Sequence, residues 1–263
     1  MAKILDGKKL SEEILRSMSQ NHKTSATLAI LSVGDDPASE VYVRNKLRAC
    51  NEVGIAYRTA HLPNNAHPVV ALQIVENWAN DPDVNGIIVQ LPCEIEGITD
   101  AIPLDKDVDG FRPGSRFTPC TPKGILRLLH ETGESLTGKH AVIVGRSEIV
   151  GKPMAKLLTD MDCTVTLCHS KTKNLAQHTK QADVLIVATG KPHLITADMV
   201  KEGAIVIDVG INRVDGKLVG DVDFERVQNV ASWITPVPGG VGPMTVTALM
   251  DNVIRAWEMH EHV

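Results

Sequence analysis

Short apolar runs alternate with helix-like segments along almost the whole chain, and this alternation constrains the fold more than any other feature. The runs span residues 27–33, 86–91, 141–145, 164–168, 183–190 and 204–212. Short continuous apolar strands joined by helices are typical of parallel sheets that are covered on both faces. The sequence therefore predicts the α/β class.

Two helical patterns stand out in the first part of the chain, at residues 39–53 and 67–79. Either Asp36 or Ser39 is expected to cap the first of these helices, because both side chains accept hydrogen bonds from free N–H groups. Gly54 is expected to end it.

Length and charge limit the classes of protein to which the chain can belong. Its 263 residues allow two domains, and the Gly-, Pro-, Ser- and Thr-rich stretch 112–122 predicts the division between them. A net charge of −5, with three Trp, two Tyr and three Phe, argues against a nucleic-acid partner. Apolar runs stay well below the roughly 18 residues of a membrane span, so we expect no membrane partner.

Cysteine usage predicts the compartment. The five cysteines include no Cys-x-x-Cys pair, and an odd number of thiols fits reduced cysteines better than disulfides or zinc. The first residues carry charges throughout and lack the apolar centre of a signal peptide. We therefore expect a soluble, cytoplasmic protein.

A glycine-containing loop, Gly145–Pro153, follows one apolar run and precedes a helical pattern. A strand, a glycine loop and a helix in this order are the context in which a pyrophosphate binds at a helix N-terminus. The fingerprint is imperfect, because Ser147 replaces the second glycine of G-x-G-x-x-G and Gly151 is displaced. An ordinary glycine turn is the alternative.

The end of the next strand favours NADP over NAD. An NAD enzyme usually places Asp or Glu there, whereas this chain has Ser170, Lys171 and Lys173. Together with Arg146 of the preceding loop, these side chains could bind a 2′-phosphate. The alternative is that both lysines belong to an ordinary solvated surface.

Tyr42, Lys46 and Gln90 are candidate chemical groups. Tyr42 and Lys46 are four residues apart on a predicted helix, so their side chains share one face and a phenol and an amine could move a proton together. Gln90 ends a predicted strand, where open α/β sheets bind ligands. An exposed lysine beside a half-buried tyrosine, and a glutamine that caps a loop, are the alternatives.

The aspartate-rich segment 105–110 begins like a calcium loop. The twelfth position, which should be a bidentate Glu, is Arg116, so the sequence predicts no calcium site and no other metal. Two interpretations remain open: a surface turn, or one carboxylate that binds the amino-amide edge of a ligand.

Pro and Gly fill most of the segment Pro236–Pro243, and a helical pattern begins at Met244. Proline fixes φ and glycine leaves the backbone bare, so the segment combines a stiff path with room for close approach. It could contact the edge of a flat ligand, or it could be an ordinary tight loop.

Taken in order, these segments resemble the bifunctional methylenetetrahydrofolate dehydrogenase/methenyltetrahydrofolate cyclohydrolase family over nearly the whole chain. The matching segments are Val33–Ser39, Tyr42–Lys46, Val89–Pro92, Lys106–Phe111, Pro119–Gly124, Gly145–Pro153, Cys168–Thr172, Asp208–Asn212 and Pro236–Thr245. Any one of them could match by chance, whereas so many in one order are specific.

The resemblance implies roles for particular residues. Lys46 is the expected catalytic lysine, Tyr42 stacks near the substrate, Gln90 hydrogen-bonds to the lysine, and Asp109 holds the pterin ring. The remaining candidates are Pro238 and Gly242 beside the folate; Arg146 and Ser170 at the 2′-phosphate; Ile211 at the carboxamide; and Gly145, Ser147, Ile149, Gly151 and Thr245 elsewhere around the cofactor.

The resemblance also implies the architecture and the activity. Residues 1–119 plus 244–263 would form an α/β substrate and catalytic domain, to which the C-terminal helix returns. Residues 120–243 would form a Rossmann-like NADP-binding domain. The expected protein is a homodimer that oxidises the folate 5,10-methylenetetrahydrofolate with NADP and hydrolyses the methenyl product to 10-formyltetrahydrofolate, in one-carbon metabolism.

The chain departs from the family pattern close to Asp109. Cys93 and Glu94 follow Pro92 where relatives have Leu-Pro, and the stretches 97–106 and 112–118 are shortened. These changes concern the rim of the folate pocket and the dimer contact. Two further hypotheses therefore stay open: an enzyme with only one of the two activities, and a binding protein without turnover.

Overall fold

The computed structural model describes residues 1–21 and 24–261, and the chain separates into two compact units. The six-stranded unit comprises Met1–Ser11 and Thr121–Thr245, and the three-stranded unit comprises Glu12–Cys120 and Val246–Val263. Residues 22–23 and 262–263, which the sequence division assigns to the substrate domain, lie outside the described residues.

The three-stranded unit is a small parallel sheet between helices. Its strands are β2 (Thr27–Val33), β3 (Ala56–Leu62) and β4 (Gly86–Val89), in the order β3-β2-β4. Its helical segments are α2 (Pro37–Val53), α3 (Pro68–Ala79), η1 (Ile98–Ala101) and parts of α1 (Gly7–Asn21) and α8 (Val241–Glu261).

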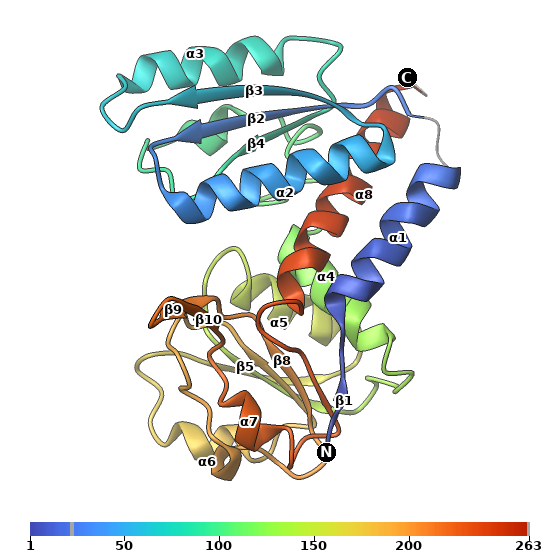
Figure 1. Ribbon diagram of the computed structural model, residues 1–263, viewed down its shortest axis with the longest axis vertical. Coiled ribbons are helices and arrows are strands. Elements are labelled where there is room, and N and C mark those ends of the chain that lie inside the picture. Colours follow the sequence, from blue (N-terminus) through green and yellow to red (C-terminus); the bar gives the residue numbers. More distant parts are fainter. Residues whose placement is uncertain (22–23, 262–263) are drawn as a thin grey trace. The chain divides into compact units, whose positions relative to one another are not determined.

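Side chains of β2 alternate between two apolar clusters. Leu28 and Ile30 pack in one cluster with residues of α2 and α8, whereas Ala29 and Leu31 pack in another with residues of α3. Figure 1 shows α2 and α3 along opposite faces of this sheet. The strand is buried on both faces, as its continuous apolar sequence predicts.

Helix α2 begins two residues earlier than its apolar pattern suggests. The side chain of Asp36 accepts a hydrogen bond from the backbone N–H of Ser39 at 2.8 Å, and Pro37 occupies the first turn, where its missing N–H is not needed. Of the two candidate caps, the structure therefore uses Asp36. Gly54 ends the helix with a φ of 79°, as predicted.

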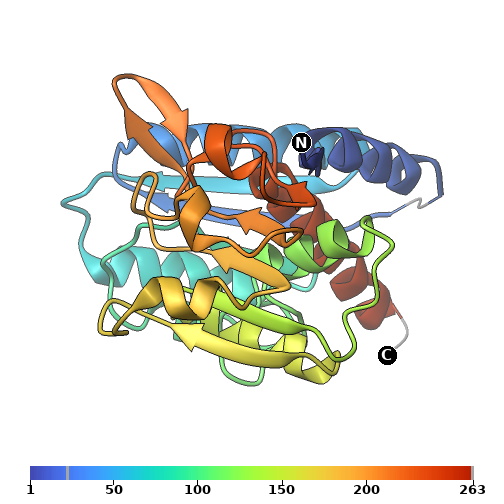
Figure 2. The same cartoon turned by 90° about the horizontal axis from the view of Figure 1, so that it is seen from below.

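The six-stranded unit is a parallel sheet in the order β1-β11-β8-β7-β5-β6. Its strands are β1 (Lys3–Ile4), β5 (His140–Val144), β6 (Thr164–Cys168), β7 (Val184–Val187), β8 (Ile205–Asp208) and β11 (Trp233–Ile234). It also contains α4 (Cys120–His130) apart from its first residue, α5 (Gly151–Asp160), α6 (Leu175–Thr179), η2 (Ala197–Met199) and α7 (Phe224–Val227). The hairpin of β9 (Asn212–Val214) and β10 (Lys217–Val219) projects from the sheet in Figure 2.

Strand β5 lies between β6, which follows it in sequence, and β7, so the direction of the connections reverses at β5. Ligands of doubly wound α/β proteins bind beyond the carboxyl ends of strands at such a point. The predicted α/β class and Rossmann-like sheet are confirmed. The predicted return of the C-terminal helix is also confirmed, because α8 begins in the six-stranded unit and ends in the three-stranded one.

The first residues of the chain belong to a different unit from the one predicted from the sequence, which grouped them with the residues up to 119. Strand β1 pairs with β11, so Met1–Ser11 belongs to the six-stranded unit. Lys3 Nζ also lies 4.8 Å from the centre of the Trp233 ring. A two-residue strand has too little pattern to be recognised in the sequence, because its place depends on a partner more than 200 residues away.

Helix α8 begins at Val241, three residues before the start expected from the sequence. Gly242 and Pro243 therefore lie in its first turn, and the stiff loop covers only the residues up to Gly240. Proline is compatible with a first helical turn because the N–H groups there have no partner within the helix.

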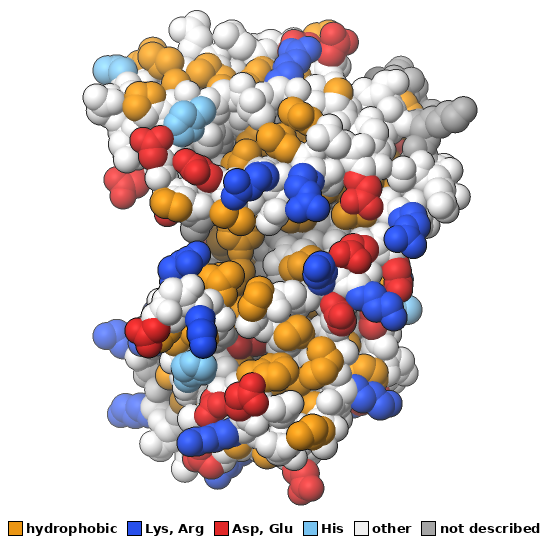
Figure 3. Space-filling view, viewed as in Figure 1, with side chains coloured by type: hydrophobic (Ala, Val, Ile, Leu, Met, Phe, Trp, Pro, Cys, Tyr) orange, Lys and Arg blue, Asp and Glu red, His pale blue; other side chains and the backbone are white. Residues whose placement is uncertain are grey.

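Surface charge is mixed on the face drawn in Figure 3, where basic and acidic side chains are interspersed. In the part of the chain that the structure describes, no helix is both long enough and apolar enough to cross a membrane.

Asn252 ties α8 to the loop that contains Asp109. Its side-chain amide is fully buried and donates to the backbone oxygens of Val108 at 2.8 Å and Thr118 at 3.0 Å. A buried carbonyl oxygen without a donor is costly. Asn252 therefore supports the path of this shortened segment.

We predict that Asn252→Ala lowers the free energy of unfolding by about 2–4 kcal/mol, because the buried Val108 oxygen and the partly buried Thr118 oxygen each lose a donor. Urea denaturation of the whole chain measures this change. Asn229→Ala is the matched control, since exposed Asn229 donates to a helix carbonyl at Glu225; its effect should stay within about 0.5 kcal/mol. Equal losses in the two variants would contradict the role given to Asn252.

Candidate active site and cofactor pocket

Lys46 of α2 and Gln90, which follows β4, meet within the three-stranded unit. Lys46 is buried, and its Nζ donates to Oε1 of Gln90 at 3.0 Å. The other end of the Gln90 amide donates through Nε2 to the backbone oxygen of Leu91 at 2.8 Å. Both ends of the amide are engaged, so its orientation is determined, and with it the position of the lysine amine.

A further hydrogen bond extends this chain to the cap of α2. Ser39 Oγ donates to the same Leu91 oxygen at 3.1 Å and to Oδ2 of Asp36 at 2.8 Å. The sequence singled out Ser39 only as a possible helix cap, since nothing in the pattern indicates a contact with residue 91. Tyr42 lies one helical turn before Lys46, and burial raises the pKa of its phenol, which keeps the ring neutral.

Asp109 lies within electrostatic reach of Lys46. Burial raises the pKa of the Asp109 carboxyl, while the charge of Lys46 and a hydrogen bond with Cys120 act in the opposite direction. Gly110 follows with a φ of 72°, which turns the chain directly after the carboxylate. The structure thus brings three of the predicted catalytic residues, Lys46, Gln90 and Asp109, into one network of contacts and charges.

The other aspartates of this segment have different partners. Asp107 accepts hydrogen bonds from the backbone N–H of Arg112 at 2.9 Å and of Phe111 at 3.4 Å, which closes the turn. Asp105 pairs with His260 at 3.3 Å. Among the described residues, no cluster of three or more His, Cys, Asp or Glu side chains could hold a metal ion.

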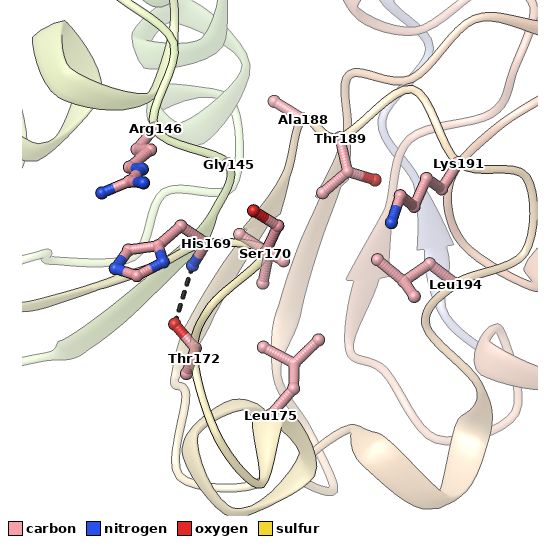
Figure 4. A pocket seen from close by; sticks show the side chains of 11 residues that line it. Gly145, Arg146, His169, Ser170, Thr172, Leu175, Ala188, Thr189, Lys191 and Leu194 are labelled. Carbon is pink, nitrogen blue, oxygen red and sulfur yellow. Dashed lines mark hydrogen bonds between the residues drawn. The ribbon is translucent and has the colours of Figure 1, made fainter.

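A pocket of about 370 Å³ opens at the carboxyl ends of β5, β6 and β7 in the six-stranded unit (Figure 4). It is lined by Val144, Gly145, Arg146, His169, Ser170, Thr172, Leu175, Ala188, Thr189, Lys191 and Leu194. Figure 4 shows Arg146 and His169 on one side of the pocket, with Lys191 and Leu194 on the other. Gly145, Arg146 and Ser170 were among the residues predicted from the sequence.

The glycines of the first loop allow its close packing. A Cβ on Gly145 would lie 2.1 Å from the backbone oxygen of Ala188, and one on Gly151 would lie 2.0 Å from the backbone oxygen of Gly145. Ser147 Oγ accepts from the N–H groups of Val150 and Gly151 at the start of α5, and Ile149 lies between these residues in the sequence. Gly145 therefore contributes backbone without a side chain to the pocket lining, in a loop that leads into a helix start, which fits a pyrophosphate.

The basic residues of the pocket differ in part from those expected. Lys171 and Lys173 are exposed and do not line it. The N–H of Lys171 donates to His169 Nδ1 at 3.1 Å in the turn after β6. Lys191 and Thr189, from the loop after β7, line it instead. Their position after an apolar strand is the signal that could have identified them.

The remaining predicted residues also lie in the six-stranded unit. Ile211 follows β8 and is 45% exposed, and a Cβ on Gly242 would lie 3.8 Å from its Cδ1. Thr245 Oγ1 lies 3.1 Å from Thr121 Oγ1 and donates to the backbone oxygen of Val241. Pro238 follows a cis peptide bond in the loop before α8. Ile211 and Gly242 are thus neighbours, whereas the Thr245 hydroxyl bonds within its own unit.

Comparisons with known proteins agree with a catalytic site in the three-stranded unit and a cofactor pocket in the six-stranded unit. The model of the tetrahydrofolate dehydrogenase/cyclohydrolase catalytic domain matches residues 5–109, and that of the NAD(P)-binding domain of the same family matches residues 119–261. The bifunctional protein FolD of Nitrosospira multiformis is 50% identical over 277 residues, which cover 98% of this chain and 96% of that protein.

Solved structures give the same result. The bifunctional enzyme FolD, a methylenetetrahydrofolate dehydrogenase/cyclohydrolase from Campylobacter jejuni, superimposes with a TM-score of 0.93 at 45% identity, over 98% of this chain and 99% of that one. The methylenetetrahydrofolate dehydrogenase-cyclohydrolase of Trypanosoma brucei, complexed with NADP and an inhibitor, has a TM-score of 0.94 at 30% identity, over 100% and 99%. With both domains matched in order, as the motifs predicted, the chain belongs to the tetrahydrofolate dehydrogenase/cyclohydrolase family.

Proposed function

We propose that this chain oxidises 5,10-methylenetetrahydrofolate to 5,10-methenyltetrahydrofolate with NADP and then hydrolyses that product to 10-formyltetrahydrofolate. The observation that carries the proposal is the Lys46–Gln90 hydrogen bond beside Asp109, within the span that matches the family's catalytic domain. An intact set of chemical groups favours an enzyme over a binding protein, despite the shortened segments nearby.

The oxidation depends mainly on position. When bound, NADP supplies the acceptor for the hydride that leaves the methylene carbon. No proton is released in this step, so the protein has to hold the folate in place and tolerate the cation that forms on it. In our proposal the Asp109 carboxylate binds the amino-amide edge of the pterin through two hydrogen bonds and also provides a negative charge near that cation.

The hydrolysis requires proton transfer. Water attacks the methenyl carbon, and a first proton leaves the attacking oxygen. A ring C–N bond then breaks as its nitrogen takes a proton, and the second proton leaves the same oxygen as the formyl C=O forms. The net reaction consumes one water and releases one proton. Lys46 Nζ is the group that we propose for these transfers, because Gln90 holds it at 3.0 Å and burial shields it from bulk water. Tyr42, kept neutral, stacks near the substrate.

We assign the cofactor to the pocket of the six-stranded unit. Arg146 and Ser170, which line it, would bind the 2′-phosphate. The close-packed loop from Gly145 to Gly151, which includes Ser147 and Ile149, would bind the pyrophosphate. Contacts proposed from the resemblance alone are Ile211 and Thr245 with the cofactor, and Pro238 and Gly242 with the folate.

Domain roles, assembly and compartment complete the proposal. Residues 1–119 plus 244–263 would form the folate-binding and catalytic domain, and residues 120–243 would form the NADP-binding domain. Strand β1 of the first domain would pair with β11 in the sheet of the second. We propose a homodimer. The outer edge of β3, which pairs with no further strand among the described residues and on which Tyr57 is 40% exposed, would suit such a contact. Five free thiols suit the reducing cytoplasm.

The function is tested by supplying methylenetetrahydrofolate with NADP and following both the reduced cofactor and the formyl product. The wild-type protein should form both.

Lys46→Met should lower hydrolysis of the methenyl compound by about 100-fold or more, because it removes the proton-transfer group, while NADP binding is retained. Lys156→Met, at an exposed lysine of α5, is the control and should hydrolyse normally. Reduced cofactor without accelerated hydrolysis in the wild type would contradict the second activity, and unchanged hydrolysis in Lys46→Met would contradict the assigned role.

Arg146→Ala should weaken NADP binding by roughly 1.5–3 kcal/mol, about 10- to 150-fold, because a charged hydrogen bond to the 2′-phosphate is lost. NAD, which lacks that phosphate, should bind almost as before. Titration calorimetry with both cofactors measures the difference, and Lys171→Ala, outside the pocket lining, is the control. If both cofactors lost the same affinity, Arg146 would not recognise the phosphate.

Acidification should weaken folate binding through Asp109. Burial raises the pKa of this carboxyl above its ordinary value near 4, so on lowering the pH it is protonated earlier than an exposed aspartate would be. A protonated carboxyl cannot accept both pterin hydrogen bonds, so the KM for folate should rise as the pH falls. Asp109→Asn should bind folate weakly at every pH and lack this acid limb. An acid limb that persists in Asp109→Asn would assign the titration to another group.

A further inference from the structure

Two buried carboxylates in the six-stranded unit take no part in the chemistry described above. Asp208 is the last residue of β8, and Asp221 follows β10; their exposed fractions are 3% and 0%. Burying a carboxylate is unfavourable unless hydrogen bonds replace its water. Their partners therefore indicate what the pair holds in place.

Asp221 joins the loops that follow two different strands. Its Oδ2 accepts from the backbone N–H of Thr189 at 2.6 Å, from the Thr189 hydroxyl at 2.9 Å and from the N–H of Gly190 at 3.0 Å. Its Oδ1 accepts from Nδ2 of Asn212 at 2.9 Å. One carboxylate thus links the loop after β7 to the segment after β8.

Asp208 in turn holds the backbone that carries Asp221. Its Oδ1 accepts from the N–H of Gly210 at 3.0 Å and of Asp221 at 2.9 Å, and its Oδ2 accepts from the N–H of Val222 at 2.9 Å. Burial raises the pKa of Asp208 to about 7, and the neighbouring Asp221 charge acts in the same direction. The backbone that carries Asp221 is therefore held at two consecutive N–H groups.

Two glycines leave the space that these carboxylates occupy. A Cβ on Gly210 would lie 2.2 Å from Cγ of Asp221, and a Cβ on Gly220 would lie 1.8 Å from Oδ2 of Asp208. Any other residue at either position would displace a carboxylate. The pair and the two glycines form one close-packed arrangement.

Both segments held by the pair reach residues assigned to the cofactor. Thr189 lines the pocket at the carboxyl ends of β5, β6 and β7, and its orientation there is visible in Figure 4. Ile211 lies between Gly210 and Asn212, the residues that bind Asp208 and Asp221. The pair therefore determines the relative position of the pocket wall and of the backbone at Ile211.

We infer that Asp208 and Asp221 form a positioning pair for NADP. By fixing the Thr189 loop and the Ile211 segment relative to each other, they determine the position in which the cofactor is bound for hydride transfer. Asp221 is the residue on which this depends, since it alone contacts both segments among the hydrogen bonds described. The inference rests on the proposed NADP-dependent function. It predicts that Asp221 matters for the oxidation and not for the hydrolysis, which uses no NADP.

The test combines direct NADP titration by calorimetry with separate assays of oxidation and of methenyl hydrolysis, on the full chain. Asp221→Ala should raise the Kd for NADP by about tenfold or more, because it leaves two loop N–H groups without an acceptor. The oxidation rate at saturating NADP should also fall, while hydrolysis stays within about twofold of the wild type. Asp221→Asn keeps one oxygen for Thr189 and Gly190, so it should recover part of the affinity.

Asp183→Ala is the matched control. Asp183 also accepts a backbone N–H, that of His140 at 2.8 Å, and pairs with Lys201, but it lies just before β7, at the amino ends of the strands. This variant should lose stability without a change in the Kd for NADP. A rise in Kd equal to that of Asp221→Ala would overturn the inference, because any lost carboxylate would then have the same effect.

Asn212→Ala keeps the inference testable if Asp221→Ala does not fold. It removes the link between Asp221 and the segment after β8, together with a longer hydrogen bond of 3.4 Å from Asn212 Nδ2 to the backbone oxygen of Val219. It should show a smaller loss that is again confined to NADP binding and oxidation. Equal loss of hydrolysis in Asn212→Ala, or an unchanged Kd in a folded Asp221→Ala, would overturn the pair's role. A wild-type protein that neither binds nor reduces NADP would instead overturn the proposed function, and this inference with it.

Discussion

Burial of parallel strands on both faces is the constraint on which the rest of this protein depends. Strands such as Val184–Val187 carry apolar side chains on both sides, which leaves little room for polar groups in the middle of the sheet. The polar groups of the two sites lie on a helix, as Lys46 does, or at the carboxyl ends of strands. Gln90 after β4 and Thr189 after β7 both occupy that position.

Loops at these strand ends are made rigid by buried polar side chains rather than by apolar packing. Asn252 holds the segment around Asp109 through two backbone oxygens, and Asp221 holds two loops of the cofactor unit through backbone N–H groups and one side-chain amide. Each replaces the water that the loop backbone would otherwise bind. The loops can therefore be short and still hold functional groups such as Asp109 in defined positions.

Much of the site could be predicted because its signals are local. Tyr42 and Lys46 share a helix face through their spacing alone, Gln90 follows a recognisable strand, and Gly145 and Arg146 follow another. Ser39, in the lysine's hydrogen-bond chain, could not be predicted in this way. Its role depends on a contact with Leu91, which is distant in sequence, and the placement of β1 beside β11 is likewise a long-range contact.

The sequence by itself determined the α/β class, the order of the strands and helices along the chain, and most candidate groups, because apolar periodicity, glycines and motif order are properties of neighbouring residues. Only the tertiary structure decided which strand-end residues line the pocket, which aspartate of the segment 105–110 faces Lys46, and that Asp208 and Asp221 are joined. Those outcomes depend on which buried donors and acceptors meet when separate segments pack, and a linear pattern does not contain that information.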